Sequence, residues 1–284
     1  FNRLGTGLIE RAVLAGIPRF MTPTDFWTVC PTSQLLLGDG SLCSGPSVQA
    51  GNCLKHFAQS TQGRLVSKIA KGLPTGCADL LVRLTKAGAL PDYPKRPEVL
   101  AIAERLTTNV SRLNQLNGLF VPNAFMKEFL VRHGVLASLI TEAAFGVNIT
   151  SAVDSNTRLL SHSGPLRIGF IGTLAPYKGS HVLVEAFKNL PDGGAILKIY
   201  GSLEDFPDYA NGLITGAANH PSIEFCGTFP NLNIMQILAD IDVLIVPSLW
   251  YENTPLVLYS AQAAGCPVIA SDLPGLAAVI THDE

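Results

Sequence analysis

The residues best suited to chemistry lie in the second half of the chain, where an acid, a lysine and several glycines follow strand-like runs. Glu252 stands just before an expected helix in the stretch YENTPLVLYSAQAAGCPVIAS. Lys178 stands in the turn GTLAPYKGS, which also precedes a helix. Glycines let the backbone approach a ligand closely, and helix N-terminal amides attract phosphate. The rest of the chain decides whether these two loops form a ligand site or ordinary helix starts.

Helix capping is a sufficient alternative explanation for Glu252. A carboxylate near a helix start gains about 0.3–1 kcal/mol from the helix dipole. Thr254 suits the N-cap, Pro255 the first helical position, and Gly265 the left-handed position after the helix end. These residues predict a helix over residues 255–264. By itself the Lys178 loop is better explained as a surface lysine beside a turn glycine, since it matches neither the Walker nor the dinucleotide glycine pattern.

Three further features suit a ligand site at the same place. Trp250 and Tyr251 precede the acid and suit a rim that faces a sugar. Ser260 is a poor residue for a helix interior and indicates a polar role or a close contact. Gly201 follows another strand-like run and offers a second close approach of the backbone.

The elements that must position these residues alternate regularly. Short apolar runs rich in β-branched residues predict five buried strands: Leu166–Thr173, Ala195–Gly201, Ile223–Thr228, Asp242–Ser248 and Pro267–Ser271. Helical patterns separate them: Ser180–Leu190, Pro207–Ala218, Leu232–Ala239 and Pro255–Ala264. Strands that are apolar on both faces and alternate with helices predict a parallel, doubly wound α/β domain. Ligands bind beyond the carboxyl ends of such strands, which is where the three loops lie.

The first half predicts a less regular α/β domain with a helical insertion. The expected elements are, in order, helix Leu4–Ala15, strand Pro18–Thr24, a loop with cysteines, helices Leu65–Lys71, Cys77–Ala87 and Pro97–Leu116, strand Leu119–Pro122, helix Ala124–His133 and strand Ser138–Phe145. The polar run from Thr150 to Gly164 lacks periodicity and predicts a linker. We therefore expect domains at 1–150 and 166–284, joined by residues 151–165. Phe1 at the start and the abrupt end at Glu284 indicate a fragment of a longer protein, incomplete at both termini.

Three cysteines and a histidine in the first half leave three alternatives open. Cys30, Cys43, Cys53 and His56 are spaced C-x12-C-x9-C-x2-H. Thiolates and an imidazole can bind zinc, and Cys53 with His56 is a plausible chelating pair. The other spacings match no zinc signature, so disulfides or unrelated buried thiols are together favoured, and no metal is assigned. Cys226 and Cys266, in strand-like surroundings, are expected to be small core residues.

Composition excludes several classes of function. The net charge is −2 and the pI is 6.3, which gives no electrostatic reason to expect a nucleic-acid partner. No apolar run reaches the roughly 18–20 residues that span a bilayer, and no signal-peptide layout is present at the start. With 47% hydrophobic and 15% charged residues, the sequence predicts a soluble protein with a large core that could still contact a membrane surface.

Several motifs in order resemble the retaining GT-B glycosyltransferases of the family 4 group. The second half carries G-T-L-x-x-x-K-G-S, I-x-F-x-G, D-V-L-I-V-P-S-x-W-Y-E-N-T-P-L-V and A-G-C-P-V-I-A-S, which are similar to that family's donor half. TDFWTVCP, DGSLCSGP and F-V-P-N-A-F-M-K-E-F-L, with a later F-G-V-N, resemble its acceptor half. The resemblance covers about residues 1–280. It implies two Rossmann-like doubly wound domains that face a cleft, the first lacking its usual first strand and glycine-rich loop.

The resemblance also implies roles for particular residues. Lys178, with the loop from Gly172 and Thr173, would hold the diphosphate of a nucleotide-sugar. The amides from Asn253 through Thr254 and Pro255 to Leu256 would add to this anion site. Glu252 would face the donor sugar as the first acid of the family's E-x7-E pattern, Gly201 would line the site, and Asp25 would join the catalytic set. The leaving group would be stabilised without a divalent metal, and no cofactor is expected because the nucleotide-sugar is a substrate.

Three departures from the family pattern favour a second hypothesis. Ser260 stands where the family's second acid usually binds the nucleotide ribose, Thr173 where an arginine is frequent, and Thr24 where a histidine is frequent. A degenerate GT-B protein that binds nucleotide-sugar without turnover is therefore the alternative. An unrelated α/β nucleotide-binding protein is disfavoured, because it would lack the paired acceptor half. The expected partners are a nucleotide-sugar and a glycan or lipid-linked acceptor, with a cytoplasmic location at the inner membrane face and a role in polysaccharide assembly.

Overall fold

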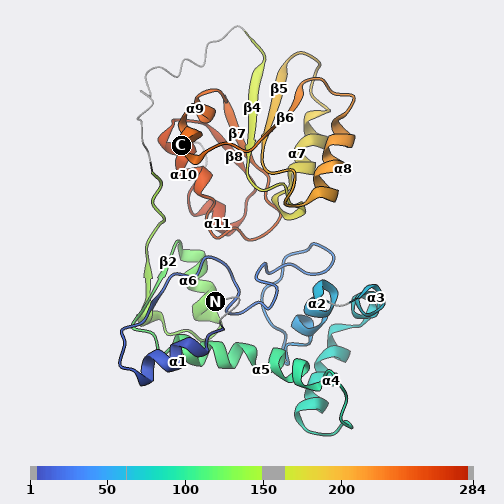
Figure 1. Cartoon of the computed structure of the whole chain (residues 1–284), viewed down its shortest axis with the longest axis vertical. Helices are drawn as coiled ribbons and strands as arrows, with labels where there is room; N and C mark the ends of the chain where they lie inside the picture. Colours follow the sequence, from blue (N-terminus) through green and yellow to red (C-terminus); the bar gives the residue numbers. More distant parts are fainter. Residues whose placement is uncertain (1–4, 62, 149–163, 281–284) are drawn as a thin grey trace. The chain divides into compact units, whose positions relative to one another are not determined.

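The computed structural model describes residues 5–61, 63–148 and 164–280 of the chain. The molecule divides into two compact units, Phe1–Ala144 and Phe145–Glu284, which are called unit 1 and unit 2 below (Figure 1). Most of the predicted linker, residues 151–165, lies outside the described residues.

Unit 2 is built on a parallel sheet of five strands. The strand order is β6-β5-β4-β7-β8, and every neighbouring pair is parallel. The strands are β4 (Leu166–Ile171), β5 (Ala195–Tyr200), β6 (Ile223–Gly227), β7 (Val243–Val246) and β8 (Val268–Ala270). All five match the strands predicted from apolar runs. The parallel α/β architecture predicted for this half is therefore confirmed.

Helices cover both faces of this sheet and bury a core on each (Figure 1). On one face, α7 (Ser180–Phe187) and α8 (Pro207–Ala217) pack against β4 and β5. On the other, α9 (Ile234–Ala239), α10 (Leu256–Ala263) and α11 (Pro274–Ala277) pack against β7. Short 3-10 turns, η3 (Pro176–Lys178) and η4 (Asn231–Asn233), precede α7 and α9. Because both faces are covered, the central strands need apolar side chains on both sides.

The direction of winding reverses at β4. The chain runs from β4 to β5 and β6 toward one edge of the sheet, then returns to place β7 and β8 on the other side of β4. The connections that leave β4 and β7 therefore run toward opposite edges of the sheet, which makes the carboxyl ends of these two strands a topological switch point. Such a point is where open α/β sheets bind ligands, and here it lies beside Lys178 and Glu252.

Unit 1 holds a smaller parallel sheet in the order β1-β2-β3. Its elements are α1 (Gly7–Leu14), β1 (Phe20–Met21), α2 (Gly51–Thr61), α3 (Arg64–Gly72), α4 (Thr75–Lys86), α5 (Arg96–Leu113), β2 (Gly118–Val121), α6 (Ala124–Arg132), the 3-10 turn η1 (Ala137–Leu139) and β3 (Ile140–Glu142). The strand predicted over residues 138–145 is shorter than expected, because its first residues form η1. The three helices predicted between residues 65 and 116 are present as α3, α4 and α5.

The region predicted as a cysteine-containing loop contains a helix, α2, and the sequence prediction was wrong there. The Asp79 carboxylate on α4 accepts hydrogen bonds from the amides of Gly51 (2.8 Å) and Gln49 (3.2 Å), at the start of α2. A Cβ on Gly51 would lie 2.4 Å from the Asp79 nitrogen, so glycine permits this close approach of the two helices. An acid distant in the sequence thus caps α2, and no local pattern reveals it.

Cys226 is also placed differently from the prediction. Cys266 is buried as expected, whereas Cys226 is exposed. β6 lies at the edge of the sheet, and its residues alternate between half-buried and exposed positions. An edge strand turns alternate side chains toward solvent, which explains why an apolar-looking run did not make every residue a core residue.

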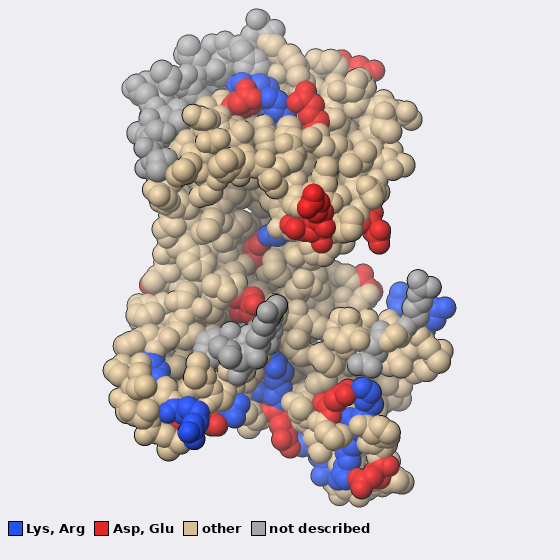
Figure 2. Space-filling view, in the orientation of Figure 1, with Lys and Arg blue, Asp and Glu red and all other residues tan. Residues whose placement is uncertain are grey.

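Charged groups are sparse on the surface. On the face shown in Figure 2, acidic and basic side chains are interspersed among larger areas of other residues. Across the described ranges, no helix combines the length and apolar character needed to cross a membrane.

Candidate functional site

The loop between β4 and α7 is held against the end of β7. Gly179 has a φ of 74° and forms the N-cap of α7. A Cβ at this position would lie 1.9 Å from the carbonyl oxygen of Pro247. In addition, the Leu249 amide donates to the Tyr177 carbonyl oxygen at 2.8 Å. Glycine is therefore required at position 179 for two reasons, its positive φ and the absence of a Cβ next to the Pro247 carbonyl. It allows the loop after β4 to contact the loop after β7.

Lys178 and Glu252 meet at this junction. The Lys178 Nζ donates to Glu252 Oε1 at 2.7 Å, and the Ser248 hydroxyl donates to the same oxygen at 2.6 Å. The Glu252 side chain is 5% exposed and that of Lys178 is 22% exposed. Removal of a carboxylate from water is unfavourable unless charge and hydrogen bonds compensate, and these two donors supply both. The lysine retains a path to solvent.

An aromatic wall adjoins the ion pair. The ring centroids of Tyr177 and Trp250 are 4.7 Å apart, and the Lys178 Nζ lies 5.3 Å from the Trp250 centroid. Burial, with the nearby Glu252 carboxylate, raises the pKa of the Tyr177 phenol. Within the described residues, the buried Trp250 Nε1 has no hydrogen-bond partner. The predicted sugar-facing rim is therefore adjacent to the pair and keeps one unused donor.

The backbone of Glu252 is fixed from the other side by α11. A Cβ on Gly275 would lie 1.7 Å from the Glu252 carbonyl oxygen. Gly275 is buried, so this contact leaves no room for a larger residue. Sequence reasoning assigned nothing to Gly275 or Ser248, although Ser248 lies at the end of a predicted strand, four residues before the acid.

The helix after Glu252 begins one residue later than predicted. Pro255 is the N-cap of α10 and makes no side-chain cap hydrogen bond. The Thr254 hydroxyl donates to the Asn253 carbonyl oxygen, so the prediction that Thr254 is the N-cap was wrong. The side-chain hydrogen bonds of Glu252 go to Lys178 and Ser248, and helix capping does not account for this residue. Since proline has no amide hydrogen, Pro255 can shape an anion site but cannot donate to it.

The end of α10 agrees with prediction. Gly265 has a φ of 62°, its amide bonds the Gln262 carbonyl, and the Cys266 amide bonds the Ala261 carbonyl. This is a Schellman arrangement. Ser260 is buried in the helix, and its hydroxyl donates to the Leu256 carbonyl at 3.3 Å.

The other predicted donor-side residues border the same edge of the sheet. A Cβ on Gly201 would lie 2.3 Å from the carbonyl oxygen of Gly172, so the loops after β4 and β5 also touch. Thr173, the residue after Gly172, is half-buried. Unit 2 therefore brings Gly172, Gly201, Lys178 and Glu252 to the carboxyl ends of β4, β5 and β7.

Asp25, the remaining predicted catalytic residue, belongs to unit 1. Its carboxylate accepts a hydrogen bond from the Trp27 amide at 2.7 Å, as in an Asx turn. The Arg105 guanidinium stacks 4.4 Å from the Trp27 ring and bonds the Trp27 carbonyl. Burial lowers the pKa of Arg105, with opposition from nearby anionic groups that include Asp25. A catalytic role for Asp25 stays a prediction.

The predicted cysteine and histidine cluster gathers around one small cavity. Cys30, Cys43, Cys53 and His56 all line a space of about 10 Å³. The three thiols are buried and free, so none of them forms a disulfide. Burial, with the neighbouring Cys30 and Cys43 thiols, raises the pKa of Cys53 to about 12. In the part of the chain that the structure describes, no group of three or more His, Cys, Asp or Glu side chains is arranged to hold a metal ion.

Comparison with known proteins gives a family match for the second half of the chain. Residues 155–284 match the family described as glycosyl transferases group 1. An uncharacterised glycosyltransferase of Methanocaldococcus jannaschii is 33% identical over 115 residues, which cover 40% of this chain and 29% of that protein. The amylovoran biosynthesis glycosyltransferase of Erwinia amylovora is 26% identical over 271 residues, or 84% of this chain and 65% of that protein. The chain therefore spans less than two thirds of the length of either relative.

A solved structure extends the likeness to the fold. The Anabaena protein HepE, in complex with UDP and glucose, superposes with a TM-score of 0.53 at 19% identity, over 73% of this chain and 66% of that protein. The chain has the GT-B fold. Its two parallel α/β units are the two Rossmann-like parts of that fold, as the sequence predicted.

Proposed function

We propose that the protein is a glycosyltransferase that moves a sugar from a nucleotide-sugar to a glycan or lipid-linked acceptor, with retention of configuration. The observation that carries the proposal is the Lys178–Glu252 pair at the switch point of unit 2, where an ammonium group and a carboxylate stand 2.7 Å apart. The match of residues 155–284 to glycosyl transferases group 1 supports it. So does the fold shared with a protein solved with UDP and glucose.

In this proposal, donor binding replaces the ion pair. The donor's diphosphate pairs with the ammonium group of Lys178. It also accepts hydrogen bonds from the amides of Asn253, Thr254 and Leu256 near the start of α10. Glu252 then accepts hydrogen bonds from hydroxyl groups of the donor sugar. Lys178 can make this exchange because its side chain is partly exposed, whereas Ser248 holds the buried Glu252 carboxylate in place.

The loops from Gly172 and Gly201 complete the donor site. Gly172, with Thr173, lets the backbone approach the phosphates, and Gly201 keeps the neighbouring loop out of their way. Ser260 is assigned to the nucleotide ribose, because a serine hydroxyl can still accept a hydrogen bond while it donates to a helix carbonyl.

The transfer step uses charge stabilisation in place of metal chemistry. The acceptor hydroxyl oxygen attacks the anomeric carbon on the face that the diphosphate leaves. The bond from that carbon to the phosphate oxygen breaks, its electron pair stays with the nucleoside diphosphate, and the acceptor proton passes to that oxygen. Lys178 and the nearby amides stabilise the charge that develops there. We propose neither a divalent metal nor a cofactor for this step.

A degenerate binder is the second candidate, and specific residues favour it. Thr24, Thr173 and Ser260 stand where the resembled family usually has a histidine, an arginine and an acid. Each substitution removes an ionisable group that could assist turnover, while hydrogen bonding to a nucleotide stays possible.

The two candidates differ in a product assay. The full-length protein is incubated with a panel of nucleotide-sugars and glycan or lipid-linked acceptors, with and without EDTA, and products are followed by mass spectrometry and anomeric NMR. Transfer with retention, unaffected by EDTA, is the expected result. Glu252→Gln should abolish transfer and leave UDP affinity within about threefold, since the carboxylate addresses the sugar. Binding of UDP by the native protein without transfer from any donor would establish the degenerate binder.

A further inference from the structure

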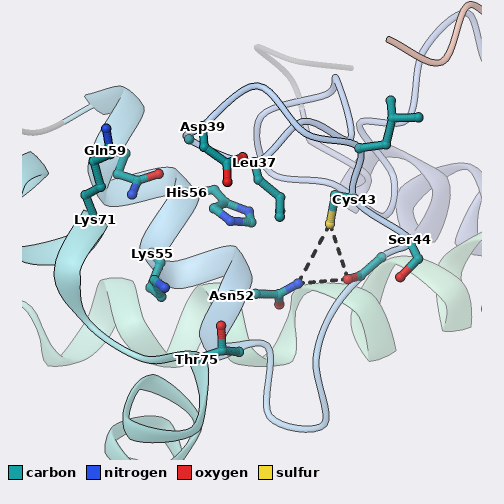
Figure 3. Close-up of a pocket in the computed structure, with 13 residues that line it drawn as sticks. Leu37, Asp39, Cys43, Ser44, Asn52, Lys55, His56, Gln59, Lys71 and Thr75 are labelled. Carbon is teal, nitrogen blue, oxygen red and sulfur yellow. Dashed lines mark hydrogen bonds between the residues drawn. The ribbon is translucent and has the colours of Figure 1, made fainter. Parts of the chain in front are cut away.

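A pocket of about 370 Å³ lies within unit 1, separate from every residue assigned to the donor. One wall is the loop around residues 37–45, and the facing wall is α2, with contributions from α3 and the start of α4 (Figure 3). Side chains from both walls point into the space between them, including Asp39 from the loop and His56 from α2. This pocket has no function in the proposed transfer step.

The two walls are tied together by hydrogen bonds. The Asn52 amide nitrogen donates to the Gly45 carbonyl at 2.9 Å, and the Asn52 side-chain oxygen accepts from the Ser47 amide at 2.7 Å. The Ser47 hydroxyl in turn donates to Asp79 on α4 at 2.7 Å. Loop and helices therefore form one preformed hollow, whose shape does not depend on a ligand to order it.

The pocket has an excess of positive charge. Lys55 and Lys71 both line it, and within the described residues neither forms an ion pair. Asp39 is the single carboxylate on its wall, and one of its oxygens already accepts bonds from the amide (3.0 Å) and hydroxyl (2.6 Å) of Ser41. Burial, followed by the charge of Lys55, lowers the pKa of the His56 imidazole. The two lysines disfavour a further positive charge in the pocket. They therefore indicate an anionic ligand.

A buried acceptor on the same wall lacks a donor. The side-chain oxygen of Gln59 is buried and, among the described residues, has no hydrogen-bond partner. It lies so close to the loop that a Cβ on Gly38 would be 1.8 Å from it. A buried oxygen without a donor is unfavourable. A small rotation of the Gln59 side chain away from Gly38 would let a ligand hydroxyl supply the missing hydrogen bond, while a bare anion would not.

We propose that this pocket binds an acidic sugar, whose phosphate or carboxylate contacts Lys55 and Lys71 and whose hydroxyl groups donate to Gln59 and Asp39. Neutral sugars lack the group that the lysines need, and inorganic phosphate lacks the sugar hydroxyls. The proposal does not rest on the transfer reaction, because the pocket and its charges belong to unit 1 alone.

Direct binding to the whole protein tests the proposal. Glucose 6-phosphate, glucuronate, glucose and inorganic phosphate are titrated by calorimetry or ligand-observed NMR. We expect glucose 6-phosphate or glucuronate to bind at least tenfold more tightly than glucose and inorganic phosphate, and the stronger of the two identifies the acidic group. Equal affinity for glucose and both acidic sugars, affinity for inorganic phosphate equal to that for glucose 6-phosphate, or no binding of either acidic sugar would overturn it.

Matched variants locate the site. Lys55→Gln and Lys71→Gln should each weaken binding of the preferred acidic sugar at least fivefold. Lys68→Gln, an exposed residue on the same helix as Lys71 that does not line the pocket, should leave it unchanged. Gln59→Leu should weaken acidic-sugar binding as well. Equal loss in Lys68→Gln, or no loss in the two pocket lysine variants, contradicts the proposal. UDP affinity measured on the same samples reports on unit 2, so failure here is distinct from failure of the proposed transferase.

Discussion

Glu252 illustrates how a single buried carboxylate is held in one place. Ser248 and Lys178 both donate to the same oxygen, and the side chain is almost fully buried. The Gly275 contact fixes its backbone from the opposite side. A residue supported in this way has lost its freedom before any ligand arrives, which lowers the entropy lost on binding. The lysine is the more mobile partner, because it is the more exposed.

Lys178→Ala tests the phosphate assignment at the residue scale. We expect UDP affinity to fall about 10- to 100-fold, because a charge-assisted hydrogen bond contributes about 1.5–3 kcal/mol. The free energy of unfolding should also fall, since Glu252 is left buried without its cation. Calorimetry with UDP and urea unfolding measure the two effects.

Lys188→Ala is the matched control for that change. Lys188 lies at the far end of α7 and pairs with Glu185, an exposed residue, at 2.8 Å. Surface pairs of this kind contribute about 0–1 kcal/mol, and UDP affinity should not change. Equal UDP affinity for native protein and the Lys178 variant would show that the phosphate lies elsewhere.

At the scale of elements, the site depends on how closely the loops after β4 and β7 approach. Gly179 is the point of contact, with its positive φ and the Pro247 carbonyl against it. Lys178 directly precedes this glycine, in the loop after β4. Its partner Glu252 lies in the loop after β7, so the ion pair needs both loops. Packing between elements, rather than either loop alone, therefore sets the distance between lysine and acid.

Gly179→Ala should destabilise the protein by more than Gly193→Ala. Both glycines have a positive φ (74° and 76°), so each alanine has a left-handed strain of about 1–2 kcal/mol. A Cβ on Gly193 meets nothing within 4 Å, whereas one on Gly179 meets the Pro247 oxygen. Urea unfolding measures both losses, and UDP affinity should fall only in the Gly179 variant. Equal losses in the two variants would mean that the loop can move away without penalty.

The buried thiols of α2 and its neighbouring loop give a second test at this scale. Burial raises the pKa of both Cys53 and Cys43, so their reactive thiolate form is scarce at neutral pH. With a thiol reagent at pH 8, exposed Cys77 should react first. Exposed Cys226 should follow more slowly, because partial burial raises its pKa.

The remaining thiols should react only after unfolding in denaturant. They are Cys30, Cys43, Cys53 and Cys266, all buried. Absorbance of the released reagent counts the thiols in each phase. Rapid native-state labelling of Cys53, identified by peptide mapping, would contradict the enclosed position of α2.

At the scale of the whole molecule, each unit has its own sheet and its own buried core. The residues proposed to bind the donor belong to unit 2, and the pocket proposed to bind an acidic sugar belongs to unit 1. A ligand that binds one folded unit stabilises that unit by mass action, by about 2.7 kcal/mol at a concentration of 100 Kd.

We therefore expect two thermal transitions in calorimetry, of which UDP raises only one. The transition that UDP shifts should be that of unit 2, and it should move by several degrees at 100 Kd. Lys178→Ala should remove the shift without changing the other transition. A single transition that shifts as a whole with UDP would show that the two units unfold as one cooperative body.

Local sequence was sufficient for much of the fold. The five strands of unit 2 are short apolar runs bounded by glycine or proline, and each was found within two residues. Gly265 after α10 and Gly179 before α7 marked helix boundaries, because few other residues tolerate a positive φ. The alternation of these elements was enough to predict a parallel doubly wound sheet.

Other features had no local signal. The helix α2 begins where Asp79, 28 residues away, accepts the Gly51 amide, so no pattern within the helix announces its start. Cys226 looked like a core residue until the strand order placed β6 at the edge. Contacts between distant residues decide both, and a sequence window contains neither partner.

The sequence by itself determined that an acid and a lysine stand in loops at the same edge of a parallel sheet. Only the tertiary structure decided that Glu252 is no helix cap but the buried partner of Lys178, 74 residues earlier, with Ser248 beside them. It alone gathered Lys55, Lys71 and Gln59 around one pocket. The physical reason is the same in both cases: elements are specified by neighbours along the chain, whereas a site is specified by neighbours in space.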